Sequence, residues 1–178
     1  MRKDFRIAGS GGQGVIMMSM ILAEAYGLHE KLEIAQTQSY GPEARGGACR
    51  AEIVISDKEI DYVKVDKVNF FIAFNETGFQ KYSADIKPET IIFVNSTMVG
   101  EKALEPYKNN VIHSIPATSI AEENFKLVMA NIIMLGFMAA KLDNLSFESA
   151  EKALRSNLPP SQLEFNLKAL RHGYDMGV

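Results

Sequence analysis

Hydrophobic residues along the chain form short apolar runs that alternate with segments of helical spacing up to about residue 142. The runs predict strands at residues 4–8, 32–36, 48–56, 68–74, 90–95 and 111–115. Two of them, Val68 to Phe74 and Thr90 to Asn95, are apolar nearly throughout, which is typical of parallel strands buried on both faces. Asp57-Lys58 would allow a hairpin between residues 48–56 and 59–63.

Helical spacing predicts helices at residues 13–29, 76–84 and 119–142, followed by two C-terminal helices. Ser119 and Glu122, like Ser161 and Glu164, have the spacing of a capping box at a helix start. Strands that alternate with helices indicate an α/β fold, here a Rossmann-like, doubly wound, mostly parallel sheet with C-terminal helices. No linker or repeat interrupts the pattern, so we expect one domain over residues 1–178.

A glycine turn, Gly9 to Gly14, lies between the first predicted strand and the first predicted helix. Gly9, Gly11 and Gly14 fit the pattern G-x-G-x-x-G, in which glycines let the backbone turn tightly and approach a ligand. Free N–H groups at the start of a helix attract anions, so phosphate or carboxylate binding is one interpretation. The other is that the glycines only permit close packing of strand and helix.

The second predicted strand argues against a dinucleotide enzyme. Such an enzyme places Asp or Glu at the end of that strand, roughly 20 residues after the glycines, to hold a ribose. Glu33 lies instead near the beginning of the strand, and residues 36–38 at its end are Gln, Thr and Gln. The sequence also lacks C-x-x-C, a nucleophile elbow and a paired Cys and His, so we predict no catalytic residue in this chain.

Composition narrows the ligands and partners further. Nineteen Lys and Arg against 22 Asp and Glu give a net charge of -3 with interleaved signs, so we expect neither a nucleic-acid nor a membrane surface. The uncharged run from Leu127 to Ala140 is shorter than the ~20 residues that span a bilayer, which favours a cytoplasmic protein. Cys49 is the only cysteine, which excludes a self-contained cysteine-ligated iron-sulfur cluster, and the histidines lack metal-ligand spacing.

Two segments together resemble a known family: Gly-Ser-Gly-Gly-Gln-Gly-Val at residues 9–15 and Ser-Tyr-Gly-Pro-Glu-Ala-Arg-Gly-Gly at residues 39–47. Both are similar to the gamma subunit of 2-oxoacid:ferredoxin oxidoreductases, and the order of elements resembles that family along nearly the whole chain. The resemblance implies a complex that decarboxylates a 2-oxoacid on thiamine diphosphate, passes the acyl group to coenzyme A and reduces ferredoxin through iron-sulfur clusters. The ending Glu-Ala-Arg-Gly-Gly resembles the 2-oxoglutarate branch more than the pyruvate branch.

The resemblance also implies a division of labour among subunits. Thiamine diphosphate belongs to alpha and beta subunits, and the clusters belong to other polypeptides such as a ferredoxin-like delta subunit. This chain would buttress the catalytic subunits and contact coenzyme A without being catalytic alone. The alternative, from another class, is an independent small-molecule-sensing or nucleotide-binding module that uses the same crevice.

Candidate cofactor-binding residues come from the glycine turn and from the loop after the second strand. Both leave the carboxyl ends of strands, so they should border one crevice. Arg45 offers a forked donor, Gly46 and Gly47 allow close approach, and Tyr40 supplies a stacking face, although Arg45 could instead pair with Glu43 on the surface. We favour the functional loop. The full set is Gly9, Gly11, Gly12, Gln13, Gly14, Ser39, Tyr40, Arg45, Gly46 and Gly47.

Six of the nine methionines lie in two predicted helices, at positions 17, 18, 20, 129, 134 and 138. They fit either ordinary core packing or an adaptable contact with another subunit, which would make the isolated chain self-associate. Asn131 is polar within an apolar run, and we expect it to satisfy a neighbouring backbone group.

Overall fold

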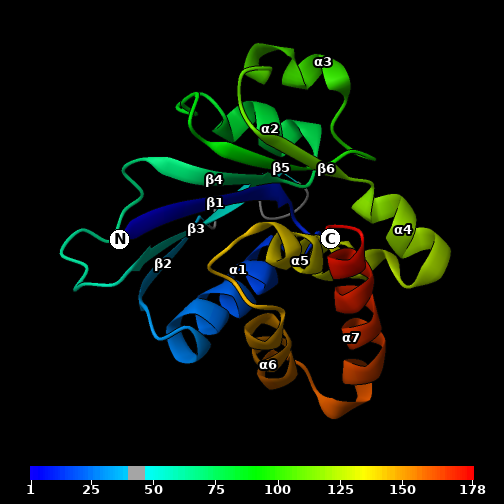
Figure 1. The fold of residues 1–178 in the computed structure, drawn as a ribbon. Helices are drawn as coiled ribbons and strands as arrows, with labels where there is room; N and C mark the ends of the chain where they lie inside the picture. The colour runs from blue at the N-terminus through cyan, green and yellow to red at the C-terminus, as the bar shows by residue number, and fades with distance from the viewer. Residues whose placement is uncertain (40–46) are drawn as a thin grey trace.

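The computed structural model describes residues 1–39 and 47–178, and in this part of the chain six strands form one sheet (Figure 1). The order across the sheet is β2-β3-β1-β4-β5-β6. The strands are β1 (Arg2–Ser10), β2 (Glu33–Ser39), β3 (Ala48–Ser56), β4 (Val68–Ala73), β5 (Ile91–Asn95) and β6 (Ile112–Ile115).

Strand direction confirms the mostly parallel sheet. β1, β4, β5 and β6 pair in parallel, whereas β3 is antiparallel to both of its neighbours, β1 and β2. β2 therefore runs in the same direction as β1, and only β3 runs the other way. As the apolar runs predicted, β4 and β5 are buried along nearly their whole length.

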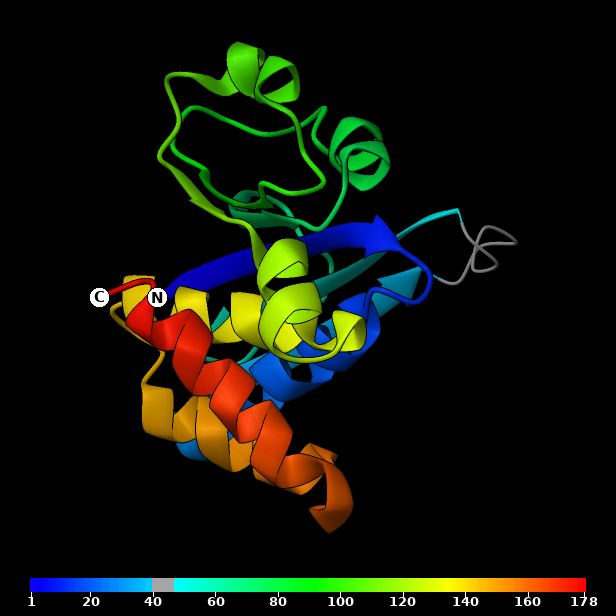
Figure 2. The ribbon, with the colours of Figure 1, turned by 90° about the vertical axis from the view of Figure 1, so that its right-hand side faces the viewer.

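Helices cover both faces of the sheet (Figures 1 and 2). α1, α5, α6 and α7 lie on one face, and α2 and α3 lie on the other. Successive residues of β1 serve the two layers, since Ile7 belongs to the larger core and Ala8 to the smaller one. The helices are α1 (Val15–Glu24), α2 (Glu76–Tyr82), α3 (Glu101–Leu104), α4 (Ala117–Asn124), α5 (Ala130–Lys141), α6 (Phe147–Asn157) and α7 (Pro160–Asp175).

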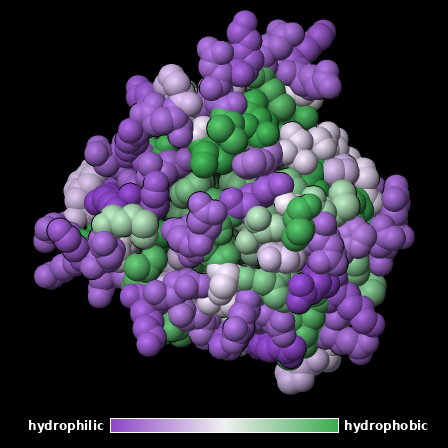
Figure 3. All heavy atoms as spheres, viewed as in Figure 1, coloured by the Kyte–Doolittle hydropathy of each residue, from purple (hydrophilic) through white to green (hydrophobic). Residues whose placement is uncertain are grey.

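Short irregular helical segments adjoin three of these helices. α1 continues as a π-helical segment, η1 (Ala25–His29), so the predicted first helix ends where expected but changes its hydrogen-bond pattern. Two 3₁₀ turns, η3 (Glu105–Tyr107) and η4 (Leu127–Met129), follow α3 and precede α5. The face seen in Figure 1 is mainly hydrophilic, with hydrophobic residues confined to smaller areas (Figure 3).

The predicted hairpin between residues 48–56 and 59–63 is wrong. β3 ends at Ser56, and residues 57–67 contain no strand. The reason is that β3 already pairs with β1 on one side and β2 on the other, so neither edge of β3 is free for a hairpin partner.

The predicted helix at residues 119–142 is also wrong in its extent. α4 begins at Ala117 and ends at Asn124, and α5 begins only at Ala130. Ser119 therefore lies inside the first turn of α4 and is not its cap, and its backbone N–H donates to Thr97 Oγ1. α7 likewise begins at Pro160, before Ser161, with no side-chain cap.

Contact between α5 and α7 brings two helix backbones together. A Cβ atom added to Gly136 would lie 2.0 Å from Leu170 O, and one added to Gly173 would lie 2.0 Å from Ile133 O. Only glycine fits at both crossing points, which fixes α5 against α7. Within residues 1–39 and 47–178, no helix has both the length and the hydrophobicity needed to cross a bilayer.

Some of the clustered methionines pack in the core, and others are exposed and could contact another subunit. Met134 and Met138 of α5 are fully buried and serve as core, as does Met18 of α1. Met17 and Met20 of α1 are 43% and 48% exposed, so these two are available for a contact outside the chain.

Candidate functional site

The glycine turn connects the end of β1 to the start of α1. Different features of the structure explain why each of its positions is occupied by glycine. Gly14 has a φ of 71°, and a Cβ atom there would lie 2.2 Å from Asn131 Nδ2. A Cβ atom on Gly9 would lie 2.8 Å from both Gln13 Oε1 and Val15 Cγ2. Close packing therefore explains these two glycines.

Crowding does not explain why position 12 is glycine. Its φ of 88° favours glycine, but a Cβ atom added there would meet nothing within 4 Å. Gly11 and Gly12 are exposed. The tip of the turn is thus open while its two ends are tightly packed, so close packing accounts for Gly9 and Gly14, and anion binding at the tip stays a prediction.

Gln13 folds back beneath the turn. Its Oε1 accepts hydrogen bonds from Ser10 N at 2.8 Å and from Asn75 Nδ2 at 2.9 Å. Asn75 also donates to Ser10 Oγ at 2.6 Å and caps α2 by accepting from Gly78 N at 2.8 Å. The network ties the end of β1 to the start of α2, and Asn75 was not predictable as part of it because this residue follows β4 without any motif.

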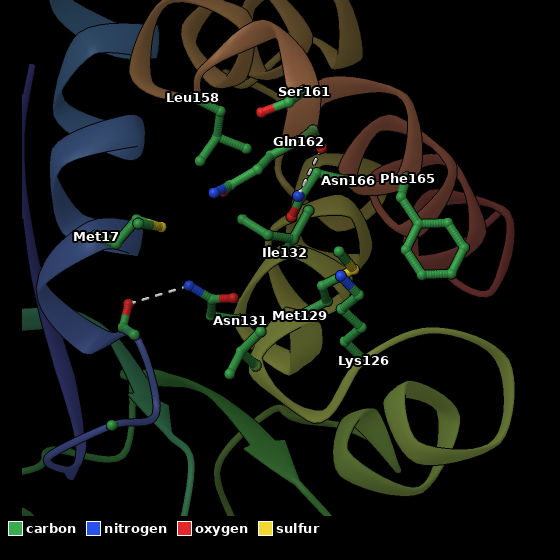
Figure 4. A pocket seen from close by; sticks show the side chains of 13 residues that line it. Met17, Lys126, Met129, Asn131, Ile132, Leu158, Ser161, Gln162, Phe165 and Asn166 are labelled. Carbon is green, nitrogen blue, oxygen red and sulfur yellow. Dashed lines mark hydrogen bonds between the residues drawn. The ribbon is translucent and has the colours of Figure 1, made fainter.

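Asn131 supports the turn from the opposite side. This residue of α5 is 2% exposed, and its Nδ2 donates to Gly14 O at 3.2 Å, which confirms that it satisfies a backbone group. The other end of the amide differs, since Asn131 Oδ1 is buried and has no hydrogen-bond partner among the described residues. Figure 4 shows the nitrogen pointing to the turn and the oxygen pointing away from it.

Two hollows adjoin the glycine turn. The first, of about 370 Å³, lies between the turn, α5 and α7 and is called the α5–α7 hollow. Its lining includes Gly12, Gly14, Met17, Asn131, Ile132, Leu158, Gln162 and Phe165. The second, of about 400 Å³, is called the switch-point hollow, and its lining includes Gly11, Gly12, Gln13, Phe74, Met98, Thr118, Glu122 and Val128. Gly12 belongs to both.

The position of the second hollow follows from the sheet topology. The chain leaves β1 toward β2 on one side of the sheet and later continues with β4, β5 and β6 on the other side. The strand order therefore switches between β1 and β4, and open α/β sheets bind ligands at that point, outside the carboxyl ends of the strands. Gln13 after β1 and Phe74 after β4 both line the switch-point hollow.

The second predicted segment lies at the same edge of the sheet. Ser10 pairs with Ala48, and Ser39 pairs with Arg50, so the ends of β1 and β2 meet the beginning of β3. Gly47 directly precedes β3. Tyr40, Arg45 and Gly46 lie outside the described residues.

The described residues do not bring the two segments into one hollow. Neither Ser39 nor Gly47 lines the two hollows at the glycine turn. Ser39 instead lines a third, polar hollow of about 440 Å³, together with Arg50 and Lys64. A common edge is therefore present, whereas a shared crevice stays a prediction.

The surroundings of two titratable side chains in the neighbouring strands β1 and β3, Arg6 and Cys49, shift their pKa values. Arg6, 6% exposed, donates to Glu52 Oε1 at 2.7 Å and also pairs with Asp85. Burial opposes its charge, but these two carboxylates outweigh burial and raise the pKa of Arg6. Burial raises the pKa of the Cys49 thiol, which lies opposite Gly9 in the sheet, so the thiolate needed for nucleophilic chemistry is disfavoured.

These features define a Rossmann-like domain with an open glycine turn at the switch point of its sheet. The chain matches the pyruvate ferredoxin/flavodoxin oxidoreductase family over residues 4–176. It is 41% identical to the 2-oxoglutarate synthase subunit KorC of Methanocaldococcus jannaschii, over 99% of this chain and 94% of that subunit. The chain belongs to this family.

Solved structures agree with this assignment. The keto/oxoacid ferredoxin oxidoreductase gamma subunit of Geobacter sulfurreducens superposes with a TM-score of 0.88 and 33% identity, over 99% of this chain and 97% of that one. The resemblance to gamma subunits is thereby confirmed. A 2-oxoglutarate:ferredoxin oxidoreductase from Magnetococcus marinus, solved with 2-oxoglutarate, coenzyme A and succinyl-CoA, shares the fold with a TM-score of 0.88 and 22% identity, over 99% of this chain and 31% of that one.

Proposed function

We propose that this chain is the gamma subunit of a 2-oxoglutarate:ferredoxin oxidoreductase, a complex that converts a 2-oxoacid to an acyl-CoA and CO₂. The observation that carries the proposal is the 41% identity to a 2-oxoglutarate synthase subunit over 99% of this chain. Cys49, the only cysteine, is buried. A chain with one cysteine needs partners for cluster chemistry, in agreement with a non-autonomous subunit.

The proposed partners are alpha, beta and ferredoxin-like delta subunits, with thiamine diphosphate and the iron-sulfur clusters on those chains and ferredoxin as the acceptor. The present chain corresponds to 31% of the longer Magnetococcus marinus chain, where the same fold is joined to further sequence, in agreement with a chain that works together with others. Exposed apolar side chains near the glycine turn, such as Met17 at 43% and Val128 at 66%, are suited to contact with another subunit. A cytoplasmic location is part of the same proposal.

The proposed role in catalysis is a contact with coenzyme A, made by the glycine turn and the loop that contains Arg45. The open tip at Gly12 supports an approach of the anionic end of the coenzyme to the turn. A charge-assisted bond from Arg45 to this end would contribute about 1.5–3 kcal/mol.

Steady-state kinetics of the assembled complex test this role. Arg45→Ala should raise the Michaelis constant for coenzyme A by about tenfold or more, since each 1.4 kcal/mol is about a factor of ten. Arg45→Lys should recover part of the loss, because an ammonium keeps the charge and loses the planar fork. Arg155→Ala is the matched control, because Arg155 is bonded to Glu151 on the exposed face of α6. An unchanged coenzyme A dependence in an intact Arg45→Ala complex would exclude the contact.

A further inference from the structure

Only one of the two polar atoms of the Asn131 side-chain amide has a hydrogen-bond partner among the described residues. Nδ2 donates to Gly14 O, while Oδ1, although buried, has no partner among the described residues. Turning the amide over would place Oδ1 against the oxygen of Gly14, so the hydrogen-bond network itself fixes the orientation. Buried polar atoms normally have a hydrogen-bond partner, so an unpaired buried oxygen in a native fold needs an explanation.

The α5–α7 hollow, of which Asn131 forms part, supplies that reason. Its volume of about 370 Å³ falls in the usual range for ligand pockets. Its walls are mixed: Met17, Ile132, Leu158 and Phe165 are apolar, whereas Lys126, Ser161, Gln162 and Asn166 are polar (Figure 4). The unpaired Oδ1 suits a ligand segment that carries an N–H group, because a carboxylate or phosphate oxygen placed beside it would oppose oxygen to oxygen.

We propose that Asn131 is a ligand-binding residue, whose Oδ1 accepts a hydrogen bond from an amide N–H of the pantetheine arm of coenzyme A in the α5–α7 hollow. This inference rests on the proposed coenzyme A contact and extends it. The arm is an uncharged aliphatic chain with secondary amides, so its methylene groups suit the apolar side chains of the hollow and its N–H groups suit the unpaired Oδ1. Gly12 lines both hollows, so one ligand can place its anionic end at the turn and its arm between α5 and α7.

Substitution by leucine, which has nearly the same shape as asparagine, separates ligand binding from support of the fold. Asn131→Leu removes a hydrogen bond and also the idle acceptor, so the melting temperature of the ligand-free chain should not fall. The dissociation constant for pantetheine, measured by NMR titration of the full chain, should rise about tenfold. A residue that only supports the turn would show the reverse, with a lower melting temperature and unchanged affinity.

Asn166 provides the matched control. It lines the same hollow and is equally polar, but its Nδ2 already donates to Gln162 O within α7 at 2.8 Å. Asn166→Leu should lower the melting temperature and change the pantetheine dissociation constant by less than about threefold. If both variants weaken binding equally, the shape of the hollow holds the ligand and the role of Asn131 is refuted.

A change on the ligand tests the same bond without any mutation. Methylation of the amide nitrogens of pantetheine, one at a time, should cost the wild-type chain about tenfold in affinity for one of the two forms, and Asn131→Leu should not distinguish that form from pantetheine itself. Equal affinity of the wild type for all forms, or no pantetheine binding at millimolar concentration, would overturn the inference. Binding of 3′-phospho-ADP, the nucleotide end of the coenzyme, reports separately on the proposed contact at the turn and should be unaffected by Asn131→Leu.

Discussion

Gly14→Ala should destabilise the fold much more than Gly12→Ala, although both glycines lie in one turn with positive φ. In Gly14→Ala the left-handed conformation costs about 1–2 kcal/mol, and displacing Asn131, whose Nδ2 would lie 2.2 Å from the new Cβ atom, adds about 1–3 kcal/mol of overpacking. The lost bond to Gly14 O adds about 1 kcal/mol, and the reduced freedom of the unfolded chain returns about 0.4–1 kcal/mol. The expected net loss is about 2–5 kcal/mol.

Gly12→Ala has only the conformational cost, because a Cβ atom there meets nothing within 4 Å, so the expected loss is about 1 kcal/mol. Urea denaturation followed by far-ultraviolet circular dichroism measures both values, since the chain has no tryptophan for fluorescence. Equal losses of unfolding free energy in the two variants would contradict this reasoning. They would show that contact with Asn131 does not make position 14 more sensitive to a Cβ atom than position 12.

Three further predictions concern the rest of the chain. Gly136→Ala should cost about 2 kcal/mol or more in urea denaturation, because α5 must move away from α7, whereas Gly100→Ala, with its nearest atom at 3.5 Å, should be nearly neutral. Burial opposes ionisation of Asp85, but the hydrogen bond and charge of Arg6 outweigh burial and lower the pKa of Asp85. The free energy that this ion pair adds to folding should therefore be fully present above pH ~4 and be lost as acid protonates the native carboxylate. The free energy of unfolding of Asp85→Asn should fall less steeply with pH over this range. The isolated chain should self-associate in sedimentation, and a monodisperse monomer would contradict this.

The architecture was predictable because its signals are local. β4 and β5 are apolar runs buried on both faces, and the glycine turn lies between a strand and a helix as expected. The missing hairpin was not predictable, because alternation over residues 59–63 indicates a strand without indicating that both edges of β3 are already paired. The early end of α4 was not predictable either, because the backbone leaves the helical region at Phe125, with a φ of -139° and a ψ of -131°, and no glycine or proline marks this point in the sequence.

The site was predictable only in part. Residues 9–14 follow a recognisable pattern, but the reason for each glycine depends on atoms from distant segments, such as Asn131 against Gly14. Asn75 and Asn131 are single asparagines without a motif, and only the fold brings them to the turn. Spacing along a sequence can locate a turn, whereas the polar residues that surround it follow from three-dimensional packing.

The most direct test of the central claim is purification of the tagged chain from its native cells, followed by an assay of ferredoxin reduction. We expect recovery with larger thiamine diphosphate-binding subunits and ferredoxin reduction that requires both 2-oxoglutarate and coenzyme A. Recovery of the chain alone, as a stable ligand-responsive protein without this activity, would contradict the claim and favour an independent small-molecule-binding module.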